Sequence, residues 1–218
     1  MKKSLLSLVS VLLLVSSASA EEQVKVNDGK GFYVGAGVGY SYYWAALTES
    51  AYNMNNGQYK FAEQDLSDED TGYLLYAGYQ FNKIVGVELA YTDYGHYTHV
   101  DIAGQEVHQD PVSTSLYANL GYNFLNGQLR PFGLLGIGYL QQNQSEQYLD
   151  VDQNVATAHF GIGVEYYPTV LKGLGFRATW SSDYYYETVI GETATGVQAS
   201  VTLWQQYGLL SASLQYKF

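Results

Sequence analysis

The chain has no cysteine and therefore no cysteine nucleophile, so a histidine acting with a serine and a carboxylate is the catalytic arrangement to look for. A lipid-modifying enzyme needs a histidine, a serine and an acid close together. His159 is followed by Phe160 and Gly161 rather than by a His-x-Ser pattern, and Glu165 lies six residues further along. In an extended strand that separation is roughly 20 Å, which is too long for a catalytic triad. We therefore predict no catalytic residue and no cofactor.

Metal binding is the second chemistry that the residue types would allow. Three of the four histidines, His96, His99 and His108, fall in one segment, and residues 63–70 hold five acids. Residues 150–154 resemble the start of a calcium loop but lack the glycine that follows in such loops. None of these spacings fixes a ligand geometry, so we predict no metal site. Weak divalent binding by the acidic segments stays open.

The overall composition excludes several classes of protein. A formal net charge of −11 argues against a nucleic-acid partner, because binding the phosphate backbone requires a basic surface. The absence of cysteine excludes a disulfide framework. Charged residues make up 14% of the chain and aromatic residues 16%, which fits neither a coiled coil nor a disordered tail.

The first twenty residues have the pattern of a secretory signal. Lys2 and Lys3 precede a short apolar stretch over residues 5–15, and small residues at 17–20 suit cleavage after Ala20. The apolar stretch is too short to cross a bilayer as a helix, which needs about 20 residues. We expect a signal peptide over 1–20, a short periplasmic segment over 21–30 and one domain over 31–218.

From residue 32 onward, apolar residues alternate with small or polar ones, which is the pattern of β-strands. Eight segments show this alternation. They cover residues 32–42, 73–81, 85–91, 116–124, 133–139, 158–166, 174–180 and 210–218. Short connections at 82–83, 125–128 and 168–173 alternate with long ones at 45–70, 95–112, 141–155 and 187–207. Short turns on one side and long loops on the other are typical of outer-membrane barrels, in which the long loops face outside.

The two faces of these strands differ in size as well as polarity. An eight-stranded barrel has an interior just wide enough for side chains to fill, so the many large apolar residues cannot point inward. They must face lipid, while the small and polar residues face the lumen. The sequence therefore predicts an all-β fold, an eight-stranded antiparallel transmembrane barrel, up-and-down and closed, with long extracellular loops.

Five charged residues share the inward parity and form a candidate ion network in the lumen. They are Glu88, Glu165, Arg130, Arg177 and Lys217. Charges in a narrow lumen must pair or stay hydrated. We expect them to plug the lumen, and a conducting gate is the alternative.

The last long connection is itself strand-like. We interpret residues 184–190 and 197–203 as a hairpin above the membrane that turns at 191–196. Its apolar parity differs from that of residues 210–214, which predicts a bulge or a break near 205–208. An exposed edge of such a hairpin could capture an extended strand of a partner.

Two glycine-rich strands and the C-terminus resemble a known family. Residues 31–40 (GFYVGAGVGY) are similar to the opening strand of small outer-membrane barrels related to the OmpA transmembrane domain and the OmpX/Ail group, and residues 131–139 (PFGLLGIGY) echo it. Leu214, Tyr216 and Phe218 resemble the terminal signal read by the barrel-assembly machinery, although Ser213 stands where glycine is frequent. The resemblance covers residues 30–218. At this length the chain also resembles the accessory colonisation factors of vibrios.

This resemblance implies a protein of the Gram-negative outer membrane, with outer-membrane lipids, lipopolysaccharide and the barrel-assembly machinery as partners. Lys60 is the only basic residue in the long loops, so contact with lipopolysaccharide phosphates would need bridging divalent ions. We expect a non-enzymatic protein whose extracellular loops act in surface contact, adhesion or colonisation, through a host-surface or other extracellular ligand. A small porin-like channel is the first alternative, and a lipid-modifying enzyme is the second.

Overall fold

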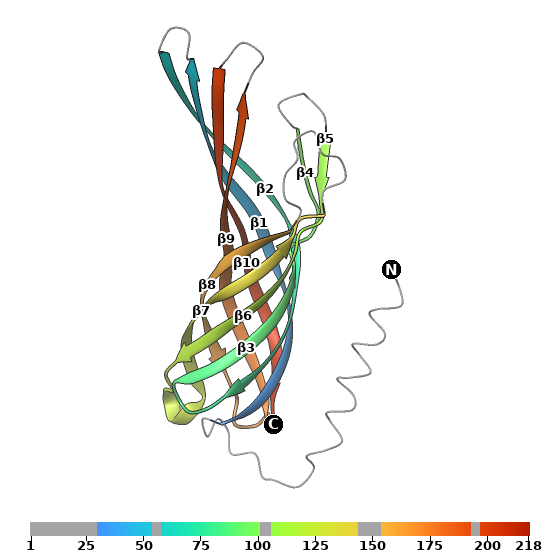
Figure 1. The fold of residues 1–218 in the computed structure, drawn as a ribbon. Helices are drawn as coiled ribbons and strands as arrows, with labels where there is room; N and C mark the ends of the chain where they lie inside the picture. The colour runs from blue at the N-terminus through green and yellow to red at the C-terminus, as the bar shows by residue number, and fades with distance from the viewer. Residues whose placement is uncertain (1–29, 54–57, 101–105, 144–153, 193–196) are drawn as a thin grey trace.

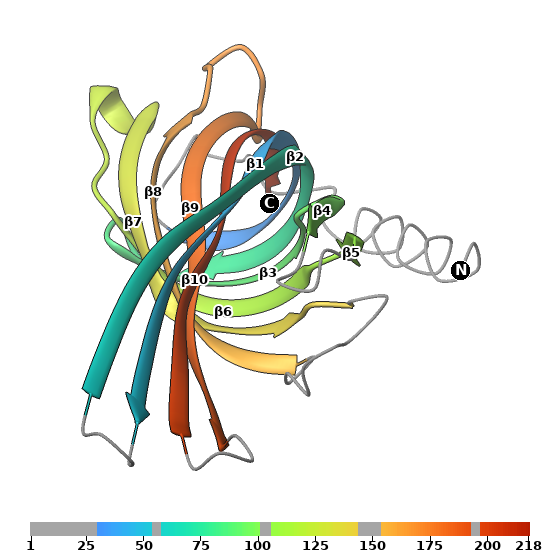
Figure 2. The ribbon, with the colours of Figure 1, turned by 90° about the horizontal axis from the view of Figure 1, so that it is seen from above.

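The computed structural model describes residues 30–53, 58–100, 106–143, 154–192 and 197–218. Eight strands form a closed antiparallel barrel in the order β1-β10-β9-β8-β7-β6-β3-β2 (Figures 1 and 2). They are β1 (Gly31–Asn53), β2 (Gln58–Gln80), β3 (Val85–Asp93), β6 (Val112–Gly121), β7 (Leu129–Gln141), β8 (Asn154–Tyr166), β9 (Leu174–Glu192) and β10 (Val197–Lys217). The predicted eight-stranded barrel is confirmed. No helix in the described ranges has the length and apolarity needed to cross a membrane.

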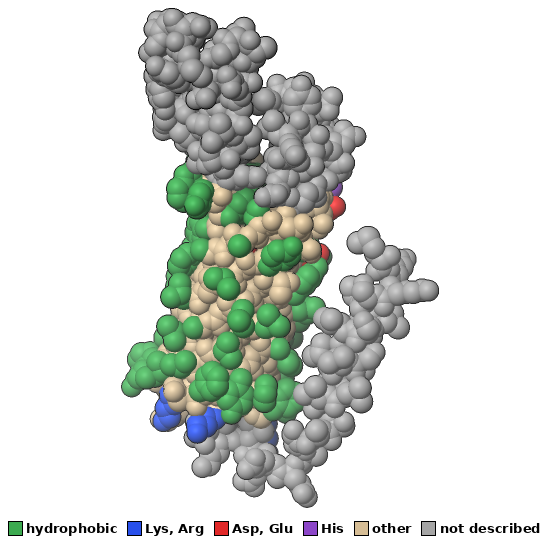
Figure 3. Space-filling view, viewed as in Figure 1, with side chains coloured by type: hydrophobic (Ala, Val, Ile, Leu, Met, Phe, Trp, Pro, Cys, Tyr) green, Lys and Arg blue, Asp and Glu red, His purple; other side chains and the backbone are tan. Residues whose placement is uncertain are grey.

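The alternation of side chains follows the prediction. Large apolar side chains cover the outside of the barrel, as the green surface in Figure 3 shows, and Leu89 and Ile137 are 53% and 68% exposed there. Bulky residues on the inward parity are accommodated by glycine on the neighbouring strand. A Cβ atom on Gly35 would lie 2.2 Å from Cζ of Tyr76, so this aromatic ring can lie across β1 only because residue 35 has no side chain.

At the end of the barrel opposite the long strands, neighbouring strands are connected by short turns. Asn82 Oδ1 accepts hydrogen bonds from the backbone N–H groups of Ile84 and Val85 at 2.8 and 2.9 Å. Asn126, in the short 3₁₀ turn η1 (Leu125–Gly127), has a φ of 57°, as expected for a tight turn of this sequence. The backbone N–H of Phe218 donates to the carbonyl of Phe32 at 2.9 Å and ties the two ends of the chain together.

Four strands continue far beyond the barrel. The β2–β3 ladder begins at Tyr73, opposite Asp93, and the β8–β9 ladder ends at Tyr184, opposite Ala158. Above these points β2, β1, β10 and β9 continue as a four-stranded sheet, which we call the outer sheet (Figure 1). Residues 45–70, which we expected to be a loop, are therefore largely strand, because the ends of β1 and β2 pair with each other up to Asn53 and Gln58.

The prediction of a bulge or a break near residues 205–208 is wrong. The β1–β10 register is constant from Tyr33 opposite Lys217 to Asn53 opposite Val197, and the β9–β10 register is also uninterrupted. The change in apolar parity has another cause. Tyr207 and Leu209 point inward and are fully buried, because the inner face becomes apolar at the top of the barrel.

The connection between β3 and β6 contains a small hairpin, β4 (Tyr97–Val100) and β5 (Glu106–Gln109), where we expected a loop. Two acids of β2 hold it. Asp70 Oδ2 accepts a hydrogen bond from the backbone N–H of His96 at 2.6 Å, and Asp68 Oδ2 accepts one from that of Thr98 at 2.9 Å. The bond from His96 holds the pKa of the Asp70 carboxyl below its usual range. The hairpin therefore lies against the outer sheet beside the mouth of the barrel (Figure 1).

Candidate functional site

The lower lumen is filled around a buried ion pair of Glu88 and Arg177. Arg177 Nη1 lies 2.7 Å from Glu88 Oε2, and both side chains are fully buried. The hydroxyls of Tyr33 and Tyr117 donate to the same carboxylate at 2.8 and 2.6 Å. The guanidinium also lies 4.4 Å from the ring centroid of Tyr76, which is close enough for a cation–π contact. These contacts compensate the cost of burying both charges.

The other three predicted lumen charges lie in two further contacts, one of which is joined to the Glu88–Arg177 pair by Asn119, whose Nδ2 donates to Glu88 Oε2 at 3.3 Å. Arg130 Nη1 lies 3.4 Å from Glu165 Oε1 and donates to Asn119 Oδ1 at 2.7 Å. Lys217 Nζ donates to Gln80 Oε1 at 2.7 Å. The structure thus brings the five charges into the lumen as two ion pairs and a lysine–glutamine hydrogen bond. Their role as a functional network stays a prediction.

The upper lumen contains a carboxylate that the sequence analysis missed. Asp183 is fully buried and accepts hydrogen bonds from Tyr94 at 2.7 Å and Thr157 at 2.8 Å. His159 Nδ1 lies 3.0 Å from the same carboxylate, and the imidazole stacks on Tyr117 with ring centroids 4.6 Å apart. Asp183 has the inward parity of β9, but our predicted strand ended at residue 180. A longer strand assignment would have found it.

Tyrosines close the top of the lumen. The ring of Tyr207 lies 4.8 Å from that of Tyr43, 5.6 Å from that of Tyr94 and 5.9 Å from that of Tyr97. The hydroxyl of Tyr207 donates to Gln109 Oε1 of β5 at 3.0 Å. We call Tyr43, Tyr94, Tyr97 and Tyr207 the tyrosine cap. Because Tyr97 belongs to β4, the small hairpin contributes directly to this cap.

The candidate metal residues are only partly within the described residues. His96 Nδ1 lies 2.7 Å from Asp110 Oδ1, and its ring stacks on that of His108 at 5.3 Å. The side chain of His99 and residues 150–153 lie outside what is described. Among the described residues, no group of three or more histidines and acids is placed to hold a metal ion. The expected absence of a metal site stays a prediction.

The predicted assembly signal lies at the end of β10. Leu214 and Tyr216 point outward, and the rings of Tyr216 and Phe218 are 5.0 Å apart in an edge-on contact. The structure places these side chains on the lipid-facing surface at the lower end of the barrel. Their recognition by the assembly machinery stays a prediction. The predicted signal peptide and most of the periplasmic segment fall among residues 1–29, outside the described residues.

Comparisons with known proteins agree with this architecture. A family model described as an outer membrane protein beta-barrel domain matches residues 10–218. The outer membrane protein OprG from Pseudomonas aeruginosa has a similar fold, with 13% identity, a TM-score of 0.57 and coverage of 88% of this chain and 99% of that one. Neisserial surface protein A is 18% identical, with a TM-score of 0.49 and coverage of 86% and 97%. A comparison with curated protein sequences gives no significant match. At these identities the likeness to solved structures concerns the fold alone.

Proposed function

Because this chain belongs to the outer membrane protein β-barrel family and lies in the bacterial outer membrane, we propose that it acts at the cell surface by contact through its outer sheet. The barrel is the membrane anchor in this proposal, and the four long strands present the contact surface. Its ligand would be a host-surface or other extracellular molecule. We also propose that residues 1–20 are a signal peptide, that 21–30 are periplasmic and that the assembly machinery reads the C-terminus.

The filled lumen is the observation that carries this proposal. The two ion pairs occupy the lower lumen, Asp183 and its partners lie above them, and the tyrosine cap closes the top. A solute would have to displace the buried Glu88–Arg177 pair and the packed rings around Tyr207 to pass. Separating such a pair leaves each buried charge without its counter-charge, which costs free energy. This arrangement favours an anchor over a channel.

The outer sheet offers a means of contact. Beyond Tyr184, β9 pairs only with β10 within the described residues, so its other edge presents unpaired backbone N–H and C=O groups up to Glu192. Such an edge can bind an extended segment of a partner by adding a strand. The expected hairpin is thus part of a larger sheet, which holds the edge rigidly above the membrane.

The experiment compares adhesion with conductance in the same variants. Replacing residues 189–201 with an Asn-Gly turn keeps the Thr188–Thr202 pair and removes the top of the β9 edge. We expect cells that carry this variant to lose adhesion to host-cell and matrix surfaces while the barrel still folds, as a heat-modifiable gel shift would report. Lys83→Gln, at the opposite end of the barrel, is the control and should adhere normally.

Two results would replace this proposal. Normal adhesion by the shortened variant would show that the top of the β9 edge takes no part in the contact. Steady conductance by the unmodified protein in planar bilayers, together with solute uptake by cells, would favour the porin-like channel.

A further inference from the structure

Two adjoining cavities lie on the outside of β1 and β2, where the barrel continues into the outer sheet. The first has a volume of about 540 Å³ and is lined by Tyr40, Tyr42, Tyr43, Trp44, Ser67, Asp68, Glu69 and Gln206. The second, of about 400 Å³, shares Tyr40 and Glu69 with it. Tyr40 and Trp44 are 49% and 39% exposed, so their rings are open to a ligand. The first cavity falls within the usual range for small-molecule sites, roughly 300–1,000 Å³.

The aromatic floor of the first cavity is held in place by specific contacts. The hydroxyl of Tyr42 accepts hydrogen bonds from Trp180 Nε1 at 2.8 Å and from Gln206 Nε2 at 2.9 Å. Its ring lies across β10 at Gly208, where a Cβ atom would be 2.1 Å from Tyr42 Cζ. Tyr40 stacks beside it with ring centroids 6.3 Å apart and donates a hydrogen bond to Glu69. Rings fixed in this way are pre-organised for binding.

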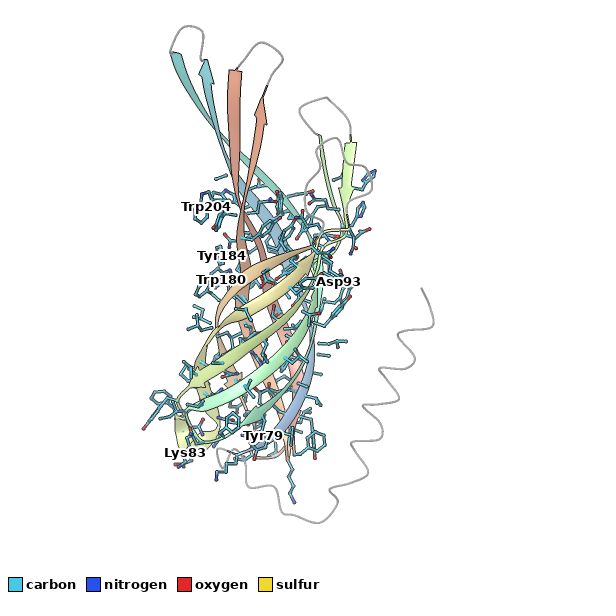
Figure 4. All side chains as sticks on the ribbon, in the orientation of Figure 1. Tyr79, Lys83, Asp93, Trp180, Tyr184 and Trp204 are labelled. Carbon is cyan, nitrogen blue, oxygen red and sulfur yellow. The ribbon has the colours of Figure 1, made fainter. Side chains whose placement is uncertain are left out.

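A membrane-interface belt alone does not account for this arrangement. Interface aromatics need only an apolar ring and a polar edge at the headgroup level. Here the same surface carries the exposed carboxylate of Glu69 and the exposed hydroxyl of Ser67. An ionised carboxylate facing hydrocarbon would be expensive, so the cavity must lie above the apolar part of the membrane. Trp180, Tyr184 and Trp204 lie at increasing height on β9 and β10 (Figure 4), and Trp180 joins this row to the cavity through its hydrogen bond to Tyr42.

The chemistry of the lining matches a sugar. A pyranose ring has a face of C–H groups that can lie on an aromatic ring, and an edge of hydroxyls that both donate and accept hydrogen bonds. Glu69 supplies an acceptor and Ser67 a hydroxyl around the rings, and Gln206 supplies its amide oxygen, because its amide nitrogen already donates to Tyr42 and Ser182. Asp68 and Glu69 of the lining are both acidic, and the Asp68 carboxylate already accepts hydrogen bonds from the backbone N–H groups of Thr98 and Glu69. The two negative charges would repel phosphate, sulfate or carboxylate groups on a ligand.

We propose that this surface binds an uncharged saccharide, with one sugar ring on Tyr42 and Trp44 and a second beside Tyr40 in the adjoining cavity. The sugar can come from a glycan outside the cell or from the neutral part of lipopolysaccharide in the same membrane. The inference goes beyond the proposed contact function, because it concerns the outer face of β1 and β2, whereas the contact proposed above uses the edge of β9.

The test uses the purified full-length barrel in phospholipid nanodiscs, so its outcome does not depend on cell adhesion. Lactose, cellobiose and chitobiose are titrated by saturation-transfer NMR and tryptophan fluorescence, with a sulfated lactose as the anionic probe. We expect saturable binding of at least one neutral disaccharide and binding of the sulfated one at least about tenfold weaker. Trp44→Leu and Glu69→Gln should each lower the affinity by about tenfold or more, as the loss of a central contact does.

Tyr139→Leu is the matched control. Tyr139 is an exposed aromatic residue on β7, outside the cavity lining, and its loss should leave binding unchanged. Nanodiscs that also contain lipopolysaccharide distinguish the source. Competition by lipopolysaccharide would identify the ligand as the neighbouring lipid, and unchanged titration would identify an external glycan. Binding of none of the neutral disaccharides, equal loss in Tyr139→Leu, or tighter binding of the sulfated probe would overturn the proposal.

Discussion

Removing Arg177 should destabilise the barrel far more than removing both members of its ion pair. In Arg177→Met, Glu88 keeps the hydroxyls of Tyr33 and Tyr117 but loses the guanidinium that pairs with its carboxylate at 2.7 Å. The carboxylate is fully buried, so water cannot replace the guanidinium without rearrangement of the lumen. Breaking a buried pair in this way costs about 3–5 kcal/mol.

The double variant Glu88→Gln with Arg177→Met gives the contrasting value. The amide keeps one oxygen to accept from the tyrosines, and the thioether chain can occupy the space beside Tyr76 and Phe132, where the guanidinium lies 4.4 Å from both ring centroids. Replacing a buried ion pair by neutral groups of similar volume is often nearly neutral. We therefore expect the double variant to recover most of the loss, a coupling of roughly 2–3 kcal/mol.

Urea unfolding in lipid vesicles, followed by tryptophan fluorescence and the gel shift, measures these free energies. Lys83→Met, at an exposed turn, is the control and should change stability by less than about 0.5 kcal/mol. If Arg177→Met cost no more than this control, the lumen charges would not depend on each other. A double variant as unstable as the sum of the two single ones would refute the account equally.

Three further predictions concern the lipid face, assembly and pH. Leu89→Arg, in the middle of β3 on the lipid face, should cost roughly 2–4 kcal/mol, whereas Gly86→Ser, on the inward parity, should cost much less in the same urea titration; equal costs would contradict the assignment of faces. Deleting Phe218 should lower the yield of folded barrel in cells, measured by the gel shift, and an unchanged yield would argue against a recognition signal. Because the pKa of Asp70 is lowered in the folded protein, its ionised carboxylate stabilises the docked hairpin fully above the carboxyl's ordinary pKa, and this stabilisation is lost as pH falls through the lowered value. Hydrogen-exchange protection of the His96 amide, corrected for intrinsic exchange, should therefore fall in acid and not between neutral and mildly acidic pH.

The sequence predicted the barrel because its signal is local. A period of two over residues such as Leu89 and Ile137 identifies the lipid face without any knowledge of the partner strands. The tyrosine cap was not predictable in the same way. Tyr94, Tyr97 and Tyr207 come from three separate segments, and their contacts depend on strand register and on how the β4–β5 hairpin docks.

Two misassignments have one physical origin. We interpreted polar residues at the ends of strands as loops, so Asp183 fell outside a predicted strand and residues 45–70 were expected to be a loop. In the outer sheet, polar side chains are compatible with strand because water covers both surfaces. Asp183 is compatible with strand for another reason, because its buried carboxylate accepts hydrogen bonds inside the lumen. The expected bulge followed from a different assumption, that the apolar face stays outward along the whole strand, whereas the apolar parity of residues 205–209 changes with the environment and the backbone register does not.

The ladder between β1 and β10 joins the first and the last strand of the barrel along their whole length. All of the chain from β1 to β10 must therefore be available before this ladder can be completed, and every contact in it is between residues far apart in sequence. Closing such a long loop is entropically slow, and until it closes β1 offers an unpaired edge of more than twenty residues. Time spent in the periplasm with that edge open, rather than the stability of the finished barrel, would then set how much of the protein reaches the membrane and how much is degraded.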